Sequence, residues 1–156
     1  MTFRSHRRWI GVVMAGLVVA PPLWSQGSAR HQIDSLMADQ LPAANARDAE
    51  RFLAAFAHDS TLLFVFNGSI IRGFDPLLAQ QRQWWSKGAG GAVYVRTAPP
   101  EITLLAPGIA LAVDRLASRH TLASGEVRAD DFVVTLVWRL RPEGWRIVMA
   151  HESTVH

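Results

Sequence analysis

Apolar residues recur at helical spacing in the first half of the chain. Within residues 30–41 they lie three or four positions apart, which predicts a helix that Pro42 bends or ends. The next stretch, NARDAERFLAAFAHD, has the same period and predicts a second helix with Asn45 as its N-cap. Two helices therefore precede any strand-like pattern.

A third helix is predicted by FDPLLAQQRQWWS, where Asp75 is the expected N-cap and Pro76 the first helical residue. This segment ends with the adjacent tryptophans Trp84 and Trp85. Because successive helical residues point about 100° apart, one tryptophan can pack in the core while the other reaches a cavity or a partner. Trp85 is a candidate ligand contact, and aromatic core packing is the alternative.

Strand patterns dominate the rest of the chain. Asn67-Gly68, between apolar runs, predicts a tight hairpin, and Pro107-Gly108 predicts a second turn between strands. The segment VRADDFVVTLVWRLR alternates apolar and polar residues, and RPEGW predicts a turn into the final strand. Helices early and antiparallel strands late predict an α+β fold, with about three helices covering a curved antiparallel sheet. The concave face of such a sheet is a natural ligand cavity.

The first 29 residues have the layout of a secretory signal peptide. Three arginines precede the apolar run WIGVVMAGLVVA, two prolines interrupt its end, and small residues at Gly27 and Ala29 suit cleavage before Arg30. The run is shorter than the ~20 residues of a membrane helix, although an uncleaved anchor is the alternative. We therefore predict a signal peptide at 1–29, a single domain at 30–156, and an exported protein, periplasmic or secreted, with no membrane attachment after cleavage.

Removal of this segment changes the charge balance. The whole chain has 16 Lys and Arg against 13 Asp and Glu, but all three arginines of residues 1–29 leave with the segment. The remaining domain carries 13 of each sign and no basic patch, so nucleic acid is not an expected partner. The chain has no cysteine, so disulfides cannot stabilise it.

Two stretches of the chain resemble the nuclear transport factor 2-like superfamily. They are ARDAERFLAAFAHDSTLLFVFNGSIIRG and VTLVWRLRPEGWRIVMAHES, and the second is most similar to members of unknown function near the association domain of calcium/calmodulin-dependent kinase. The resemblance covers most of residues 30–156 and implies a cone of curved sheet wrapped by helices. Because the superfamily includes ketosteroid isomerases, polyketide cyclases, dehydratases and assembly domains, it does not select one activity.

The final strand, GWRIVMAHESTVH, changes character along one face. If the strand alternates regularly, Trp145, Ile147, Met149, His151 and Ser153 share a face that begins apolar and ends polar. In the superfamily the cone is apolar at its closed end and polar at its mouth. By this resemblance Met149 and Ser153 are candidate ligand contacts and His151 is a candidate base. A structural hydrogen bond by His151 is the alternative.

Asp114 interrupts the apolar stretch IALAVDRLA, which calls for an explanation. If its side chain points inward, burial would raise its pKa and it could act as a general base or acid. If it points outward, it would pair with Arg115 or Arg119 and have no chemical role. Apolar residues flank Asp114 at both parities, so both readings remain open.

Cofactor-free proton transfer is the enzyme class these residues support, as an isomerase, cyclase or lyase. Asp114 or His151 would be the base, while Tyr94, Trp138 or Ser153 would hold the polar end of a small apolar or amphipathic ligand. No short metal-ligand spacing, phosphate-binding glycine loop or Gly-x-Ser-x-Gly motif occurs, so neither a metal nor a cofactor is expected.

A non-catalytic assembly module is the competing hypothesis. Val133, Thr135 and Val137 form a β-branched row on the outward side of one strand, where a soluble monomer usually has more polar residues. This row predicts a homodimer. Dimerisation and ligand binding are compatible.

Overall fold

The computed structural model describes residues 23–86, 91–122 and 124–154. Residues 1–22 of the predicted signal peptide lie outside this part of the chain, and the predicted cleavage point before Arg30 falls inside the first helix. The elements follow in the order α1 (Leu23–Ala46), α2 (Ala49–Leu53), β1 (Leu63–Phe66), β2 (Ser69–Arg72), α3 (Phe74–Ser86), β3 (Val93–Arg96), β4 (Glu101–Ala106), β5 (Ile109–Thr121), β6 (Val127–Arg141) and β7 (Gly144–Thr154).

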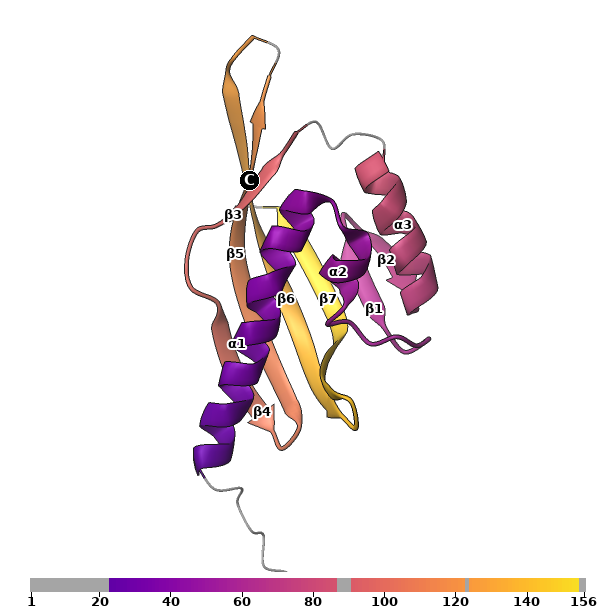
Figure 1. The fold of residues 1–156 in the computed structure, drawn as a ribbon, viewed down its shortest axis with the longest axis vertical. Helices are drawn as coiled ribbons and strands as arrows, with labels where there is room; N and C mark the ends of the chain where they lie inside the picture. The colour runs from indigo at the N-terminus through magenta and orange to yellow at the C-terminus, as the bar shows by residue number, and fades with distance from the viewer. Residues whose placement is uncertain (1–22, 87–90, 123, 155–156) are drawn as a thin grey trace, which may run out of the picture.

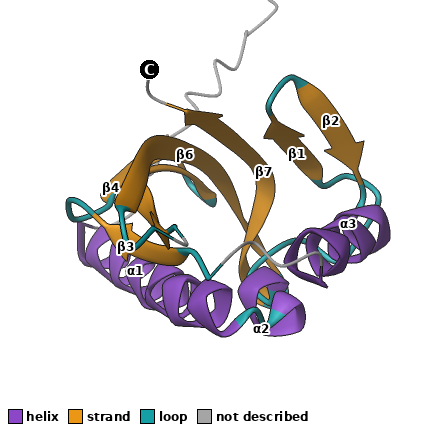
Figure 2. Ribbon diagram, turned by 90° about the horizontal axis from the view of Figure 1, so that it is seen from above, coloured by secondary structure: helices purple, strands orange, loops and turns teal. Residues whose placement is uncertain are grey.

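The strands form one sheet in the order β2-β1-β7-β6-β5-β3, and β4 pairs with the start of β5. All neighbours are antiparallel except β1 and β7, which run parallel. Figure 2 shows that the sheet curves strongly without closing and that the three helices lie on its concave side. The predicted α+β fold, a curved sheet covered by helices, is confirmed.

The core lies between the concave face of the sheet and α1, which crosses it diagonally (Figure 1). Ile33 and Met37, one helical turn apart on α1, are fully buried. Opposite them, Trp138 and Ile147 face each other on β6 and β7, and both are also fully buried. Truncating an aromatic residue at such a position typically costs about 3–5 kcal/mol, so this end of the sheet anchors the fold.

A sharp turn joins α1 to α2 and aims α2 across the end of the sheet. Arg47 adopts a left-handed conformation, with φ of 58°, and its N–H donates to the carbonyl of Ala44. The next N–H, of Asp48, donates to Ala43, which completes a Schellman motif. The side chain of Asp48 then accepts from the backbone of Arg51 as the N-cap of α2.

The prediction of Asn45 as the second helix's N-cap is wrong. Asn45 lies in the last turn of α1, which continues through Pro42. Its side chain accepts from the backbone N–H of Tyr94 at 2.8 Å and donates to that residue's carbonyl at 2.9 Å. The amide thus pairs with β3 as a neighbouring strand would, and it ties the end of α1 to the sheet.

The final strand, β7, contains an irregularity that reverses its side-chain alternation. Val137 pairs with Met149, but the next residue of β6, Trp138, pairs with Ile147. Val148 is therefore an extra residue, a β-bulge in β7. Before it Ile147 faces inward, and after it Ala150 and Glu152 do.

None of the helices in the described ranges is both long enough and apolar enough to cross a membrane.

Candidate functional site

A cavity of about 360 Å³ opens between the concave face of the sheet and the helices. Its size suits a small organic molecule. The walls combine many aromatic rings with a few polar groups: they are formed by Gln40, Leu41, Ala44, Phe52, Phe56, Phe64, Phe66, Gln81, Trp84, Trp85, Tyr94, Arg96, Asp114, Leu116, Phe132, Val134, Leu136, Ala150 and Glu152.

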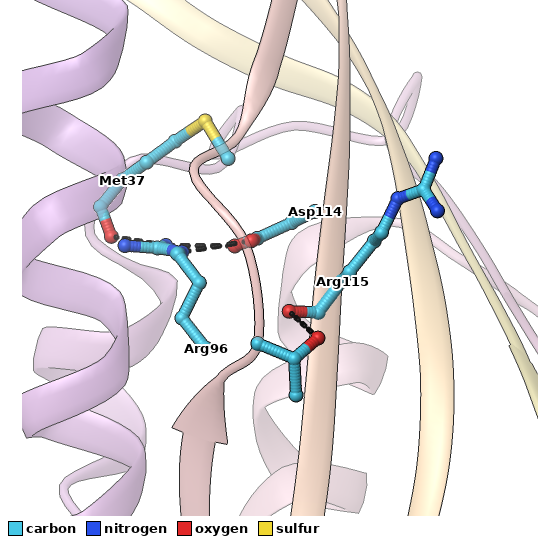
Figure 3. Close-up of polar contacts among 5 residues, drawn as sticks. Met37, Arg96, Asp114 and Arg115 are labelled. Carbon is cyan, nitrogen blue, oxygen red and sulfur yellow. Dashed lines mark hydrogen bonds and ion pairs between the residues drawn. The ribbon is translucent and has the colours of Figure 1, made fainter.

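One wall holds a buried ion pair. The side chain of Asp114 on β5 is 7 % exposed, and both its carboxylate oxygens accept hydrogen bonds of 2.7 Å from Arg96. Arg96 comes from the neighbouring strand β3, and it also donates to the carbonyl of Met37 at 3.4 Å. Figure 3 shows Asp114 pointing toward Arg96 and α1, while Arg115, the next residue, points to the opposite side.

This pairing fixes the charge of that wall. The hydrogen bond from Arg96 to Asp114 raises the pKa of the guanidinium, so the arginine remains a cation. A bidentate pair of this geometry has no net charge and leaves few acceptor positions free. Asp114 does point inward, as one of the two sequence-based readings holds, but Arg96 rather than Arg115 or Arg119 satisfies it.

The opposite wall holds a second carboxyl group, that of Glu152, which has no arginine partner like that of Asp114 among the described residues. Glu152 on β7 is half-buried and lines the cavity, and burial raises its pKa to about 7. Within the described ranges it makes no hydrogen bond or ion pair. Its ladder neighbours are Phe66 on β1 and Val134 on β6, both apolar. Near neutral pH, Glu152 can therefore exist both as an acid and as a carboxylate.

Tyr94 on β3 supplies a phenol to the same cavity. Burial, above all, raises the pKa of its hydroxyl, and the negative charge of Glu152 acts in the same direction. The group thus stays protonated and can donate a hydrogen bond. Phe132 packs edge-on against its ring at 6.2 Å between centroids, and the Arg47 guanidinium lies 5.1 Å from the ring centre.

The tryptophan pair of α3 closes the apolar side. Trp84 packs against Phe66 of β1 at 5.3 Å between ring centroids, and Trp85 packs against Phe52 of α2 at 5.4 Å. Both tryptophans line the cavity. Each one therefore packs against an aromatic ring and also faces the cavity, instead of one doing the first and the other the second.

The structure brings together three of the seven residues proposed from the sequence. Trp85, Tyr94 and Asp114 line the cavity, and their roles toward a ligand stay predictions. Trp138 does not line it: this side chain is fully buried in the core, and its Nε1 has no hydrogen-bond partner in the described part of the chain.

The predicted positions of Met149, His151 and Ser153 in the cavity are corrected. Met149 is half-buried, His151 and Ser153 are exposed, and none of the three lines the cavity. The cause is the bulge at Val148, because one extra residue moves every later odd-numbered side chain of β7 to the outer face. The polar end of the strand's inner face is Glu152.

Glu152 is the functional candidate that regular alternation misses. The sequence offers only a faint signal for it, since it is an acidic residue between two polar residues near the end of a strand. Finding it requires the position of the bulge, which depends on how β7 pairs with β6.

A metal site receives no support from the described residues, among which no three His, Cys, Asp or Glu side chains are grouped to hold an ion. The polar groups that line the cavity are instead the Arg96–Asp114 ion pair, the unpaired carboxyl of Glu152, the phenol of Tyr94 and two glutamine amides. An unpaired carboxyl in an apolar cavity can accept a proton from a bound molecule, and a phenol can stabilise the resulting negative charge.

Comparison with known proteins places this architecture among related folds. Residues 33–156 match the SnoaL-like domain family. The chain is similar to a protein with a cystatin-like fold from Caulobacter vibrioides (24% identity, TM-score 0.71, covering 83% of this chain and 92% of that one). It is also similar to a nuclear transport factor 2-like protein from Novosphingobium aromaticivorans (19% identity, TM-score 0.72, 85% of each chain).

A third similar structure bears on the assembly hypothesis. It is a Xanthomonas campestris protein named for the association domain of calcium/calmodulin dependent protein kinase II, with 13% identity and a TM-score of 0.58 over 90% of this chain and 93% of that one. At such identities the likeness concerns the fold alone. No match was found among curated proteins.

Proposed function

The chain belongs to the SnoaL-like domain family, within the nuclear transport factor 2-like superfamily, and from this premise we propose that it binds a small apolar or amphipathic molecule and transfers a proton on it without a cofactor. The observation that carries the proposal is Glu152, a half-buried carboxyl in an aromatic-lined cavity. It has no partner among the described residues, and burial raises its pKa to about 7. A base poised near the working pH is effective in proton transfer.

Glu152 replaces Asp114 and His151 as the proposed base. Asp114 is held by Arg96, and abstraction of a proton by it would break two hydrogen bonds of 2.7 Å. His151 is exposed on the outer face of the sheet. Glu152 has no such competing partner within the described ranges and lines the cavity.

Tyr94 is the proposed electrophilic partner. A carbonyl ligand with its oxygen near the phenol and its acidic C–H near Glu152 would develop an enolate, whose charge the hydroxyl stabilises. The ring faces of Phe66 and Trp84 would hold the apolar body of the ligand. The reaction class is thus an isomerisation, cyclisation or elimination that begins with C–H deprotonation.

Hydrogen–deuterium exchange at carbon tests this proposal. The domain is incubated in D₂O with a panel of cyclic and aryl ketones, and loss of the α-proton signal is followed by ¹H NMR. We expect catalysed exchange with at least one ketone and a loss of about 10²–10⁴-fold in Glu152→Gln. Glu143→Gln, which removes an exposed carboxyl outside the cavity, is the matched control. Equal exchange rates in Glu152→Gln and the control would refute Glu152 as the base.

A dimer is the second candidate function, and one observation favours it. The outer face of the sheet carries half-buried apolar residues around the predicted row. Val137 on β6 pairs with Leu111 on β5 and Met149 on β7, and Val133 lies on the same face of β6. We propose that a second copy covers this face. Sedimentation velocity should show a dimer for the wild type and a monomer for Val137→Lys; a wild-type monomer would contradict this proposal.

Export through the N-terminal segment remains part of the proposal, since residues 1–29 have the layout of a signal peptide. N-terminal sequencing of the protein from the soluble exported fraction should begin at or near Arg30. Recovery of the full chain in the membrane fraction would favour the uncleaved anchor instead.

A further inference from the structure

Glu152 has apolar neighbours and, within the described ranges, no hydrogen-bond or ion-pair partner. Across the ladder it faces Phe66 on one side and Val134 on the other, and Ala150 precedes it on the same face of β7. The arginine of this cavity, Arg96, is already bound by Asp114 through two hydrogen bonds. Among the described residues that line the cavity, no cation is therefore left to balance the negative charge of Glu152.

Aromatic rings flank this carboxyl on both sides. Phe66 is its direct neighbour on β1, and Trp84 packs edge-on against Phe66 at 5.3 Å. On the other side, Phe132 lies one inward position along β6 from Val134 and packs against Tyr94 at 6.2 Å. The faces of aromatic rings carry negative charge density and attract cations.

We infer that the ligand of this cavity carries a cationic nitrogen, an ammonium or iminium group attached to an apolar body, and that Glu152 and the flanking aromatic rings recognise it. A cation would supply the charge partner that Glu152 lacks, and the ring faces would replace part of the water it leaves. The apolar body would occupy the space between the tryptophans of α3 and the sheet. An ionised Glu152 would repel anionic ligands, and the cation among the described lining residues, Arg96, is already paired with Asp114.

This inference deepens the proposed function and rests on the same cavity. Burial raises the pKa of Glu152 to about 7, so that a neutral ligand meets a carboxyl that is ionised only in part at neutral pH. A bound cation favours the charged form of its neighbour. The substrate would thereby convert Glu152 into the carboxylate that the proton transfer requires.

The other groups that share the cavity set the expected pH dependence. Tyr94 and Arg96 on β3 and Asp114 on β5 face the same space. The pKa values of Tyr94 and Arg96 are raised from already high values, so both groups stay protonated at neutral pH. Cation binding should therefore strengthen as pH rises from about 6 to about 8, following the ionisation of Glu152.

Matched probes test the inference on the complete domain. Binding of benzyltrimethylammonium, benzylamine and the uncharged benzyl alcohol is measured by ligand-observed NMR at both pH values, for the wild type, Glu152→Gln and Glu143→Gln. We expect the two cations to bind the wild type about tenfold more tightly than benzyl alcohol at the higher pH. This preference should vanish in Glu152→Gln and persist in Glu143→Gln.

The outcomes separate this inference from the proposed function. If benzyl alcohol binds as tightly as the cations, or if Glu152→Gln keeps the cation preference, the inference is overturned while ketone exchange can still succeed. If the cations do not bind at millimolar concentration, the inference is also overturned. Cation binding that depends on Glu152, without ketone exchange, would support the inference and refute the proposed reaction. Thermal unfolding of each variant confirms that it is folded before binding is compared.

Discussion

Two carboxyl groups share one cavity in this protein, and their surroundings differ completely. On the β3–β5 wall, Asp114 is buried with two hydrogen bonds from Arg96. On the β7 wall, Glu152 is half-buried among apolar residues, and burial raises its pKa to about 7. Burial alone therefore does not make a carboxyl reactive. A buried carboxylate with a bidentate partner is a structural element, and one without a partner is available for chemistry or recognition.

Breaking the ion pair should have the largest effect on stability. Arg96→Ala leaves Asp114 buried without a partner, and we expect a loss of about 3 kcal/mol in the free energy of unfolding, measured by urea denaturation. Arg115→Ala removes a partner of Glu101 from an exposed pair and should cost less than about 1 kcal/mol. Equal losses in the two variants would show that the buried pair contributes no more to stability than the exposed one.

Neutralising Glu152 should instead increase the free energy of unfolding. The folded-state pKa of Glu152 is raised from 4.5 to about 7, so its contribution to stability is complete below pH 4.5 and is lost as pH rises through about 7. Glu152→Gln cannot ionise. We expect it to be more stable than the wild type by up to about 3 kcal/mol at pH 8 and nearly equal at pH 4.

Urea denaturation at both pH values checks this expectation, with Glu143→Gln as the control. A difference between Glu152→Gln and the wild type that does not change with pH would mean that Glu152 keeps an ordinary pKa in the folded protein.

The bulge can be mapped directly, because the chain has no native cysteine. Single substitutions His151→Cys, Glu152→Cys and Ser153→Cys place one thiol at each of three successive positions. We expect thiols at 151 and 153 to react with a maleimide dye about tenfold faster than the thiol at 152, which burial shields and holds protonated. The opposite order would restore the regular alternation of β7.

The smallest effect is expected on the outer face near the end of β7. His151→Ala and Ser153→Ala remove exposed side chains that the described structure gives no hydrogen bond, so stability should change by less than about 0.5 kcal/mol. Ketone exchange and cation binding should match the wild type. A large loss of either activity would mean that His151 or Ser153 takes part in the site. It would contradict their placement on the outer face of the sheet, away from the cavity.

Much of the fold follows from local pattern in the sequence. The Asn67-Gly68 hairpin forms as predicted, with positive φ at both residues, and Gly108 adopts the left-handed conformation of the predicted turn. These features depend on a few neighbouring residues, so the local sequence specifies them. The apolar alternation of β6 is reflected in its burial, since Leu136 and Trp138 share one face and both are buried.

The candidate site was predicted only in part, since it depends on long-range pairing. Asp114 was identified as unusual, but its partner Arg96 lies 18 residues away on an adjacent strand. Tyr94 and Trp85, proposed from the sequence as ligand contacts, line the cavity. Glu152 was missed because the inward parity of β7 changes at Val148, and nothing in the local composition marks this residue as a bulge.

By itself, the sequence determined which segments are helix and strand, that helices cover one face of a largely antiparallel sheet, and that aromatic residues are available to line a cavity. These properties arise from periodicity and turn chemistry over a few residues. Only the tertiary structure decided which carboxyl is neutralised and which is left alone. The charge state of a buried group depends on the solvent and partners around it, and strand pairing across the sheet assembles those surroundings.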